Sequence, residues 1–188
     1  MTRYADGSET TVTQGPDNRY GMMSPIPTKT TIQMPSGLTS NTTIEQSVSY
    51  QNIADPLSIR TQTFTVMENW RTSTSVFDFT TLTYTNTSSE GRVSTRTINA
   101  QGRTTSTQVP GLEPVHYSYD SRGRLQAVTQ GTGTDQRQIN YNYRTDGFVG
   151  SASDALNRLT QFDYDQSGRV LNQTLPGNRE GNSSSQIY

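Results

Sequence analysis

A five-residue turn pattern, Asp-x-x-Gly-Arg, recurs in the second half of the chain and constrains its fold more than any other feature. It is complete in DSRGR at 120–124 and in DQSGR at 165–169. Asp at the first position accepts hydrogen bonds from backbone N–H groups two residues on. Gly at the fourth position adopts the left-handed conformation that closes a type I turn with a bulge. Each copy therefore predicts a tight turn between two antiparallel strands.

Four weaker copies keep the same spacing. They are SSEGR at 88–92, NAQGR at 99–103, RTDGF at 144–148 and DALNR at 154–158. In the last of them Asn157 stands at the glycine position, and Asn is the residue next most tolerant of positive φ. Successive copies start 11, 21, 24, 10 and 11 residues apart, a unit of 10 to 11 residues with two intervals near twice that length. The pattern predicts an array of hairpins.

Alternation of apolar and polar residues predicts strands between these turns. Ile139, Tyr141 and Tyr143, for example, alternate with Asn140 and Asn142, which is the period of a half-buried strand. Helical spacing of apolar residues is missing because Thr, Ser, Asn, Gly and Pro interrupt the windows that a helix would need. The 31 Thr residues fit a pleated, half-buried surface instead. The chain is predicted to be all-β.

The chain is expected to have three regions. Residues 1–85 form an N-terminal β-strand region, residues 86–176 the hairpin array, and residues 177–188 a polar tail or linker. The first region has more proline, which is expected where strands end or lie at an edge and so at corners between strands. These prolines are Pro16, Pro25, Pro27, Pro35 and Pro56.

Composition excludes several kinds of chemistry. The chain has no Cys and a single His, His116, so disulfides, cysteine nucleophiles and thiolate or histidine-rich metal sites are excluded. No catalytic, cofactor-binding or metal-binding residue is assigned, and no enzymatic activity is expected. With 14 Arg, one Lys and a net charge of −1, there is no basic footprint for nucleic acid. No apolar run is long enough for a membrane span, and no signal peptide is recognisable.

Arginine follows the glycine in most copies of the turn and begins the returning strand. In stacked hairpins each Arg is expected to lie near an Asp or an aromatic ring of the neighbouring unit, a contact worth about 0.5–1 kcal/mol. Arg suits this place because its planar group can bond a carboxylate and stack on a ring together. The residues expected to build the repeats are Tyr119, Asp120, Gly123, Arg124, Tyr164, Asp165, Gly168, Arg169, Gly102, Arg103, Gly91 and Arg92.

The segments YDSRGRL at 119–125 and YDQSGRV at 164–170 resemble the tyrosine-aspartate (YD) repeat of RHS proteins. Residues 3–22, 35–40 and 88–103 are similar to the part of long bacterial RHS proteins that leads into these repeats. The resemblance implies a twisted ribbon of antiparallel hairpin repeats, or a section of a β-shell. Such shells occur in bacterial polymorphic toxins, in the B and C components of insecticidal toxin complexes and, more distantly, in teneurins.

The resemblance also implies a function. In that family the shell encloses a variable C-terminal toxin before delivery, so the expected partners are flanking repeats and a toxin cargo, and the expected location is secreted or at the cell surface. The family's delivery domain, self-cleaving core and toxin have no counterpart in this sequence, and Asp55-Pro56 lacks the glycine-containing context of the core. The chain is thus expected to be a length of wall, whose unpaired strand edges also favour self-association.

A second hypothesis is an extracellular module that binds carbohydrate. Tyr117, Tyr141 and Tyr143, with Asn, Gln and Arg around them, are the residues expected to form its ligand face. The same alternation serves packing between neighbouring hairpins, which is the favoured interpretation. Trp70, the single Trp, would support sugar binding if it is exposed on a loop and would be core if it is buried.

Overall fold

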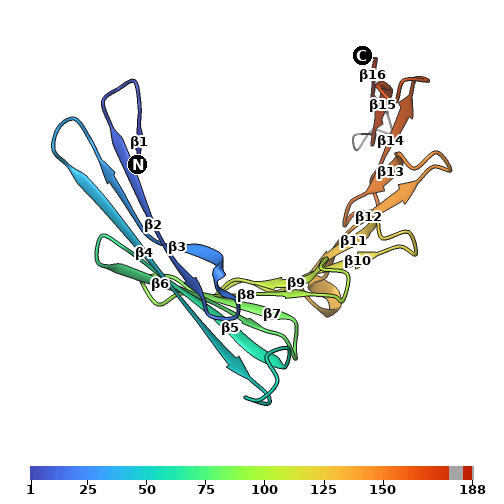
Figure 1. Ribbon diagram of the computed structural model, residues 1–188. Helices are drawn as coiled ribbons and strands as arrows, with labels where there is room; N and C mark the ends of the chain where they lie inside the picture. The colour runs from blue at the N-terminus through green and yellow to red at the C-terminus, as the bar shows by residue number, and fades with distance from the viewer. Residues whose placement is uncertain (178–183, 188) are drawn as a thin grey trace. The chain divides into compact units, whose positions relative to one another are not determined.

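The computed structural model describes residues 1–177 and 184–187, and the all-β prediction is confirmed (Figure 1). One short 3₁₀ helix, η1 (Gly133–Asp135), is the exception among the described residues. The strands of the first half are β1 (Thr2–Arg3), β2 (Glu9–Asp17), β3 (Gly21–Gln33), β4 (Thr39–Tyr50), β5 (Ile59–Glu68), β6 (Arg71–Asp78), β7 (Thr83–Thr87) and β8 (Val93–Ile98). Those of the second half are β9 (Thr104–Gln108), β10 (Val115–Tyr119), β11 (Leu125–Gln130), β12 (Arg137–Tyr143), β13 (Val149–Ser153), β14 (Leu159–Tyr164), β15 (Val170–Leu175) and β16 (Ser184–Ile187).

The chain divides into two compact units, residues 1–103 and residues 104–188. Within each unit the strands pair in chain order and every pair is antiparallel. Figure 1 shows the resulting series of hairpins in each unit. Consecutive antiparallel pairing lets short loops join all neighbouring strands. The sequence-defined regions 1–85 and 86–176 stay a prediction about where the repeats begin.

Neither unit has a hydrophobic core of the usual kind. Among the residues whose side chains are described, Ala127 is the one buried hydrophobic residue, at 6% exposure, and Asp17 is the one buried polar residue, at 4%. A sheet of one layer leaves both faces at the surface, so most strand residues are half-buried. Backbone hydrogen bonds and cross-strand side-chain pairs therefore carry the stability that a core would otherwise supply.

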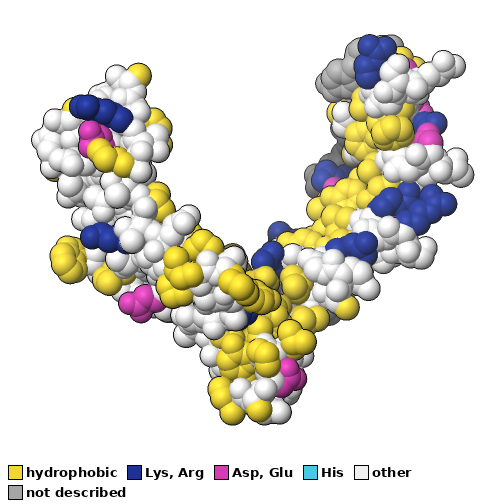
Figure 2. Space-filling model, in the orientation of Figure 1, with side chains coloured by type: hydrophobic (Ala, Val, Ile, Leu, Met, Phe, Trp, Pro, Cys, Tyr) yellow, Lys and Arg dark blue, Asp and Glu magenta, His cyan; other side chains and the backbone are white. Residues whose placement is uncertain are grey.

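The register gives the two faces of unit 2 different chemistry. Tyr117 lies opposite Val128, and Val128 lies opposite Ile139, so the three point to one face. We call it the tyrosine face; it comprises Tyr117, Tyr119, Val128, Ile139, Tyr141, Tyr143, Ala152, Phe162 and Tyr164. The other face is largely polar and comprises His116, Ser118, Ala127, Thr129, Gln138, Asn140, Asn142, Ser151, Ser153 and Gln161. Figure 2 shows hydrophobic side chains gathered on the surface of the strands.

Threonine forms rows across the strands of unit 1. One row runs from Ser47 through Thr63, Val76 and Thr85 to Thr95, each opposite the next. A neighbouring row contains hydroxyl pairs, Ser49–Thr61 at 2.6 Å and Thr83–Thr97 at 3.1 Å. We call this side the threonine face; it also carries Lys29, Thr43, Met67 and Thr72 in a row. The high Thr content thus serves cross-strand pairing.

The prolines of the first half differ partly from the prediction. Pro16 lies inside β2 beside a register shift, and Pro25 and Pro27 lie inside β3. β3 pairs with β4 only from Lys29 to Gln33, so both of its prolines lie where it has a partner on one side. Pro lacks an N–H group and is tolerated at bulges and edges. These three residues are therefore not corners between strands, whereas Pro35 and Pro56 do lie in connections.

Part of the expected polar tail is a strand. Residues 184–187 form β16, which pairs antiparallel with β15. Residues 178–183 and 188 of that expected tail lie outside the described residues.

Candidate functional surface: the repeat turns and the tyrosine face

All six copies of the pattern form the same hairpin turn. The N–H of the first residue donates to the C=O of the fifth, and the N–H of the fourth donates to the C=O of the first, at 2.8–3.1 Å. The fourth residues have positive φ, from +74° to +96° for glycine and +58° for Asn157. This is the type I turn with a bulge that the pattern predicts. The glycines are Gly91, Gly102, Gly123, Gly147 and Gly168.

Two further turns of the same build occur in unit 1 at residues 4–8 and 34–38. Their first and fifth residues are bonded at 2.9 Å and 2.8 Å, and Gly7 and Gly37 at the fourth position have φ of +83° and +85°. These two turns were not predicted; Tyr4 and Met34 stand first in them, and glycine at the fourth position is the one residue of the pattern that they keep. Glycine at the fourth position was the signal that finds them.

The alternation of turns between the two ends of the strands explains the uneven spacing of the pattern. The turns at 120–124, 144–148 and 165–169 join β10 to β11, β12 to β13 and β14 to β15, so they lie at the same end of the strands of unit 2. The turn at 154–158 joins β13 to β14 at the opposite end. The short intervals arise where successive turns at both ends have the pattern. The interval of 24 residues from 120 to 144 spans a different loop at the opposite end, residues 131–136 with η1.

An ion pair closes three of the turns. Both Nε and Nη2 of Arg124 lie 2.7 Å from Oδ2 of Asp120, and the backbone N–H of Arg124 donates to Oδ1 at 2.8 Å. This backbone bond is the largest cause of the lowered pKa of Asp120. The same pair recurs in Asp154–Arg158 and Asp165–Arg169. In these three turns the Asp partner of Arg lies in the same turn and not in the neighbouring unit, because the bulge places the first and fifth residues of the turn side by side.

Polar side chains other than Asp take the first position in two turns. Asn99 accepts the backbone N–H of Arg103 at 3.0 Å, and the Ser88 hydroxyl accepts that of Arg92 at 3.1 Å. The turn at 144–148 is built differently. Arg144 stands first and pairs with Asp146, at 3.0 Å.

The fifth residue of a turn covers the tyrosine that ends the next incoming strand. The guanidinium carbon of Arg124 lies 4.1 Å from the ring centroid of Tyr143. One hairpin later Phe148 takes the place of Arg and stacks on Tyr164, with centroids 4.9 Å apart and ring planes 25° apart. The expectation of an aromatic ring in the neighbouring hairpin is thus confirmed for Arg124.

The same tyrosines tie successive hairpins through their hydroxyl groups. Each hydroxyl donates to a main-chain carbonyl on the strand before, always at the residue that follows the fifth turn position. A β-bulge lies opposite each tyrosine, where the register shifts by one residue, and bulges bend and twist a strand locally. The bonds are Tyr119–Thr104 at 2.7 Å, Tyr143–Leu125 at 2.8 Å and Tyr164–Val149 at 3.0 Å.

The residues proposed as a ligand face lie together but are not equally available. Tyr117, Tyr141 and Tyr143 are all half-buried on the tyrosine face. Tyr143 uses its hydroxyl on Leu125 and one ring face on Arg124. For Tyr117 and Tyr141, no hydrogen bond of the hydroxyl occurs among the described residues. The geometry of Tyr143 is that of a packing residue.

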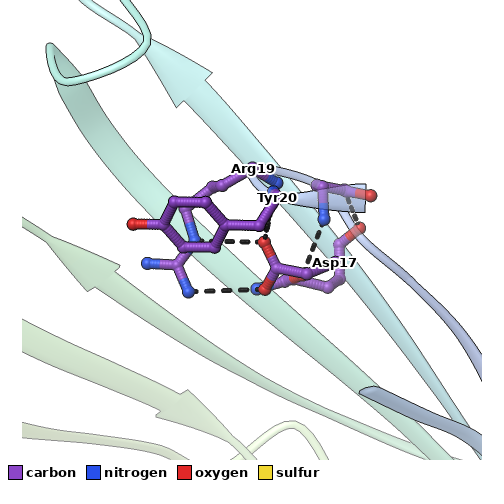
Figure 3. Close-up of polar contacts among 5 residues, drawn as sticks. Asp17, Arg19 and Tyr20 are labelled. Carbon is purple, nitrogen blue, oxygen red and sulfur yellow. Dashed lines mark hydrogen bonds and ion pairs between the residues drawn. The ribbon is translucent and has the colours of Figure 1, made fainter. Parts of the chain in front are cut away.

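The buried charge of unit 1 lies where β2 turns into β3. Oδ1 of Asp17 accepts the backbone N–H groups of Arg19 and Tyr20, at 2.7 Å and 3.2 Å, and Arg19 Nε at 3.3 Å (Figure 3). The Arg19 side chain is the largest cause that lowers the pKa of Asp17 to about 2, against the opposing effect of burial. Asn18 bonds both the side chain and the backbone carbonyl of Gln46 on β4. This cluster, which sequence reasoning missed, ties the hairpin tip to β4.

The described part of the chain shows no sign of a metal centre. No group of three or more His, Asp and Glu side chains is placed there to hold a metal ion. No helix among the same residues is long and apolar enough to cross a membrane.

Comparison with known proteins places this arrangement in a family. The model of the teneurin YD-shell family matches residues 2–181. The crystal structure of TcdB2-TccC3-TEV aligns with 92% of this chain at 10% identity and a TM-score of 0.39, and that of TcdB2-TccC3 with 91% at 11% identity and a TM-score of 0.39. This chain spans 12% of the length of each. No curated protein sequence matches it. The chain belongs to the teneurin YD-shell family, a family of structural β-shells, which confirms the resemblance to YD-repeat RHS proteins.

Proposed function

We propose that this chain is a length of wall in an RHS-type shell that encloses a C-terminal toxin and helps deliver it. The observation that carries the proposal is the family match, which covers residues 2–181. The chain acts by steric enclosure and needs no catalytic residue, cofactor or metal. Its partners are the flanking repeats and the toxin cargo of a longer polypeptide.

The single-layer construction supports this role. A sheet with one buried hydrophobic residue among those described gains little from a core of its own, so it depends on contacts with flanking structure. Tyrosine tethers hold each hairpin to the next, and ion pairs close individual turns within the hairpins. A wall built in this way is extended by adding hairpins, without redesign of an interior.

The polar side chains of the strands support enclosure without tight binding. Thr, Ser, Asn and Gln line the threonine face of unit 1 and the polar face of unit 2. Such a surface offers little apolar area, so an enclosed polypeptide would gain little free energy by binding its apolar side chains to it. YD-shell proteins are typically extracellular, and we propose that this chain is secreted or displayed as part of a larger protein.

Carbohydrate binding by the tyrosine face is the less supported alternative. The hydroxyl of Tyr143 is already bonded to Leu125 and one face of its ring is covered by Arg124, which leaves fewer of its groups to bind a sugar. The repeated geometry at Tyr119 and Tyr164 favours a packing role for the series.

Protease protection tests the enclosure. The protein is produced from the reading frame that contains this chain, with flanking repeats and the C-terminal polypeptide. It is treated with a broad-specificity protease before and after denaturation. We expect the C-terminal polypeptide to survive in the native protein and in a His116→Ala control, whose side chain is exposed. Tyr143→Ala combined with Tyr164→Ala removes two tethers and should increase its cleavage. Cleavage in the native protein as fast as in the isolated C-terminal polypeptide would contradict the proposal.

A further inference from the structure

The hairpin between β5 and β6 carries an unusual residue at its tip. Asn69 and Trp70 are its two central residues, with φ of +45° and +71°. A two-residue turn with positive φ at both positions favours Asn-Gly. Positive φ is an outlier for a bulky residue, and Trp70 is 93% exposed. An exposed, conformationally unfavourable Trp gains nothing from packing, and such outliers gather at functional sites.

A groove of about 290 Å³ lies beside this tip. The threonine face forms its floor, because Lys29 lies opposite Thr43 and Thr43 lies opposite Met67. It is lined by Lys29, Asn41, Thr43, Met67, Asn69 and Trp70. Its lining therefore combines an aromatic ring, two amides, a hydroxyl and a cation.

The rim of the groove is held in place by hydrogen bonds to β4. The Asn69 backbone N–H donates to the Asn41 carbonyl at 3.1 Å, and the Asn41 backbone N–H donates to Oδ1 of Asn69 at 3.2 Å. The Asn69 amide also donates to Ser40 Oγ at 3.3 Å. A rim fixed in this way lowers the ordering cost of binding a ligand.

Polar groups in the groove remain available for a ligand. Lys29 is the only lysine of the chain and forms no ion pair among the residues that the structure describes. The side-chain oxygen of Asn41 is bonded to the Thr31 hydroxyl at 2.9 Å, which leaves the amide nitrogen to donate elsewhere. The groove therefore presents donors and one positive charge beside an exposed indole ring.

We propose that this groove binds a pyranose sugar that carries a carboxylate. The C–H face of the ring stacks on Trp70, the carboxylate pairs with Lys29, and the ring hydroxyls bond Asn41 and Thr43. Aromatic rings with a few convergent polar groups are the usual composition of small-molecule sites. The site lies in unit 1, uses no residue of the tyrosine face, and is independent of toxin enclosure.

The single Trp makes the test direct, because all indole fluorescence of the chain comes from Trp70. The chain is titrated with digalacturonic acid and with the neutral disaccharide of galactose. We expect a saturable change in emission with the acid and a weaker affinity for the neutral sugar. No change with either sugar, in protein with an unchanged β-sheet circular dichroism spectrum, overturns the proposal.

Three variants separate the contributions. Lys29→Gln should weaken binding of the acid about tenfold and leave the neutral sugar unaffected. Arg71 directly follows Trp70 but does not line this groove. Arg71→Gln also removes one positive charge, and it should leave the affinities for both sugars unchanged. Trp70→Gly, followed by calorimetry, should abolish binding of both sugars, and glycine suits this turn. Equal weakening by Arg71→Gln, or binding retained by Trp70→Gly, overturns the site. A negative result in the sugar titrations would not change the outcome of the protease protection test, which is independent of this groove.

Discussion

The hydroxyl of Tyr143 donates a hydrogen bond to the main-chain carbonyl of Leu125 at 2.8 Å. Leu125 directly follows Arg124, whose guanidinium lies over the Tyr143 ring. Two consecutive residues of the neighbouring hairpin therefore hold one tyrosine, one by its edge and one by its face. The hydroxyl bond recurs at Tyr119 and Tyr164, so it is a property of the repeat.

Tyr143→Phe should lower the free energy of unfolding by about 0.5–1.5 kcal/mol. The change removes the hydroxyl and leaves the Leu125 carbonyl without its partner, while the ring stays under Arg124. Urea unfolding followed by circular dichroism measures it. The matched control is Tyr141→Phe, on the same strand and face, which should change stability by less than about 0.5 kcal/mol. Equal losses in the two variants would argue against the tether.

Gly147→Ala and Gly168→Ala should differ, although both residues have positive φ, +96° and +76°. At Gly147 an added Cβ meets no atom within 4 Å, so the loss should be the backbone cost alone, about 1–2 kcal/mol. At Gly168 the Cβ would lie 2.8 Å from Cζ of Phe148, which must move off Tyr164. We expect the larger loss at Gly168, by thermal or urea unfolding. The reverse order would contradict the stacking described here.

Arg124→Lys should destabilise the chain more than Arg158→Lys. Both arginines pair with the Asp four residues before them, and the structure describes a ring contact for Arg124 alone of the two. Lysine keeps the charge but loses the planar stacking group, so the difference in unfolding free energy should be about 0.5–1 kcal/mol. Equal effects would show that the turn ion pair, rather than the ring, is what arginine provides.

Asp17 should make the tip of the β2–β3 hairpin sensitive to acid. Its pKa in the folded chain is about 2, below the ordinary 3.8, mainly because of the Arg19 side chain. A lowered folded-state pKa contributes stability above the ordinary pKa, and this stability is lost as pH falls from 3.8 toward 2. The protection of the Arg19 and Tyr20 amides against hydrogen exchange, relative to the unfolded chain at the same pH, should therefore fall across that range.

Asp17→Asn provides the comparison for this prediction. It should weaken the hairpin tip already at pH 7, by about 1–3 kcal/mol, and flatten the acid dependence of exchange at Arg19 and Tyr20. The lowered pKa values of Asp120 and Asp165 remain in the variant, so global acid unfolding should persist. An unchanged local pH profile would mean that another group controls the tip.

Trp70→Gly should stabilise the β5–β6 hairpin, by about 0.5–1 kcal/mol. Glycine relieves the positive φ of +71°, and the exposed indole ring contributes little packing. Urea unfolding measures the gain, with Asn157→Gly as a second replacement at positive φ. A loss of stability would show that the indole makes a contact of structural value.

The repeat turns were predictable from sequence because their bonds are local. The first and fifth residues of each turn are joined by a short stretch of chain, so Asp120, Gly123 and their equivalents determine the conformation almost alone. The all-β class followed from the same turns and from alternation between them. The turns at 4–8 and 34–38 keep only the glycine of the pattern and were not predicted, although that glycine stands where the turn requires it.

Contacts between strands depended on register, which the sequence by itself did not reveal. Whether Arg124 meets its own Asp120 or a neighbour's depends on the bulge that brings first and fifth residues together. The Tyr143 acceptor lies 18 residues away, and only the pairing of β11 with β12 places it within reach. Likewise, ENWRT alone left Trp70 equally able to be core or surface.

The local chemistry of this chain thus determined where it turns and that it forms β-hairpins. The pairing of distant strands decided which side chains share a face and which turns lie at the same end of the strands. It also decided that Asp17 is buried while Trp70 is exposed. The physical reason is the distance along the chain between the interacting residues. A turn is stabilised by atoms a few residues apart, whereas a face or groove exists only after several strands align, and a shift of one residue would exchange its side chains for those of the other face.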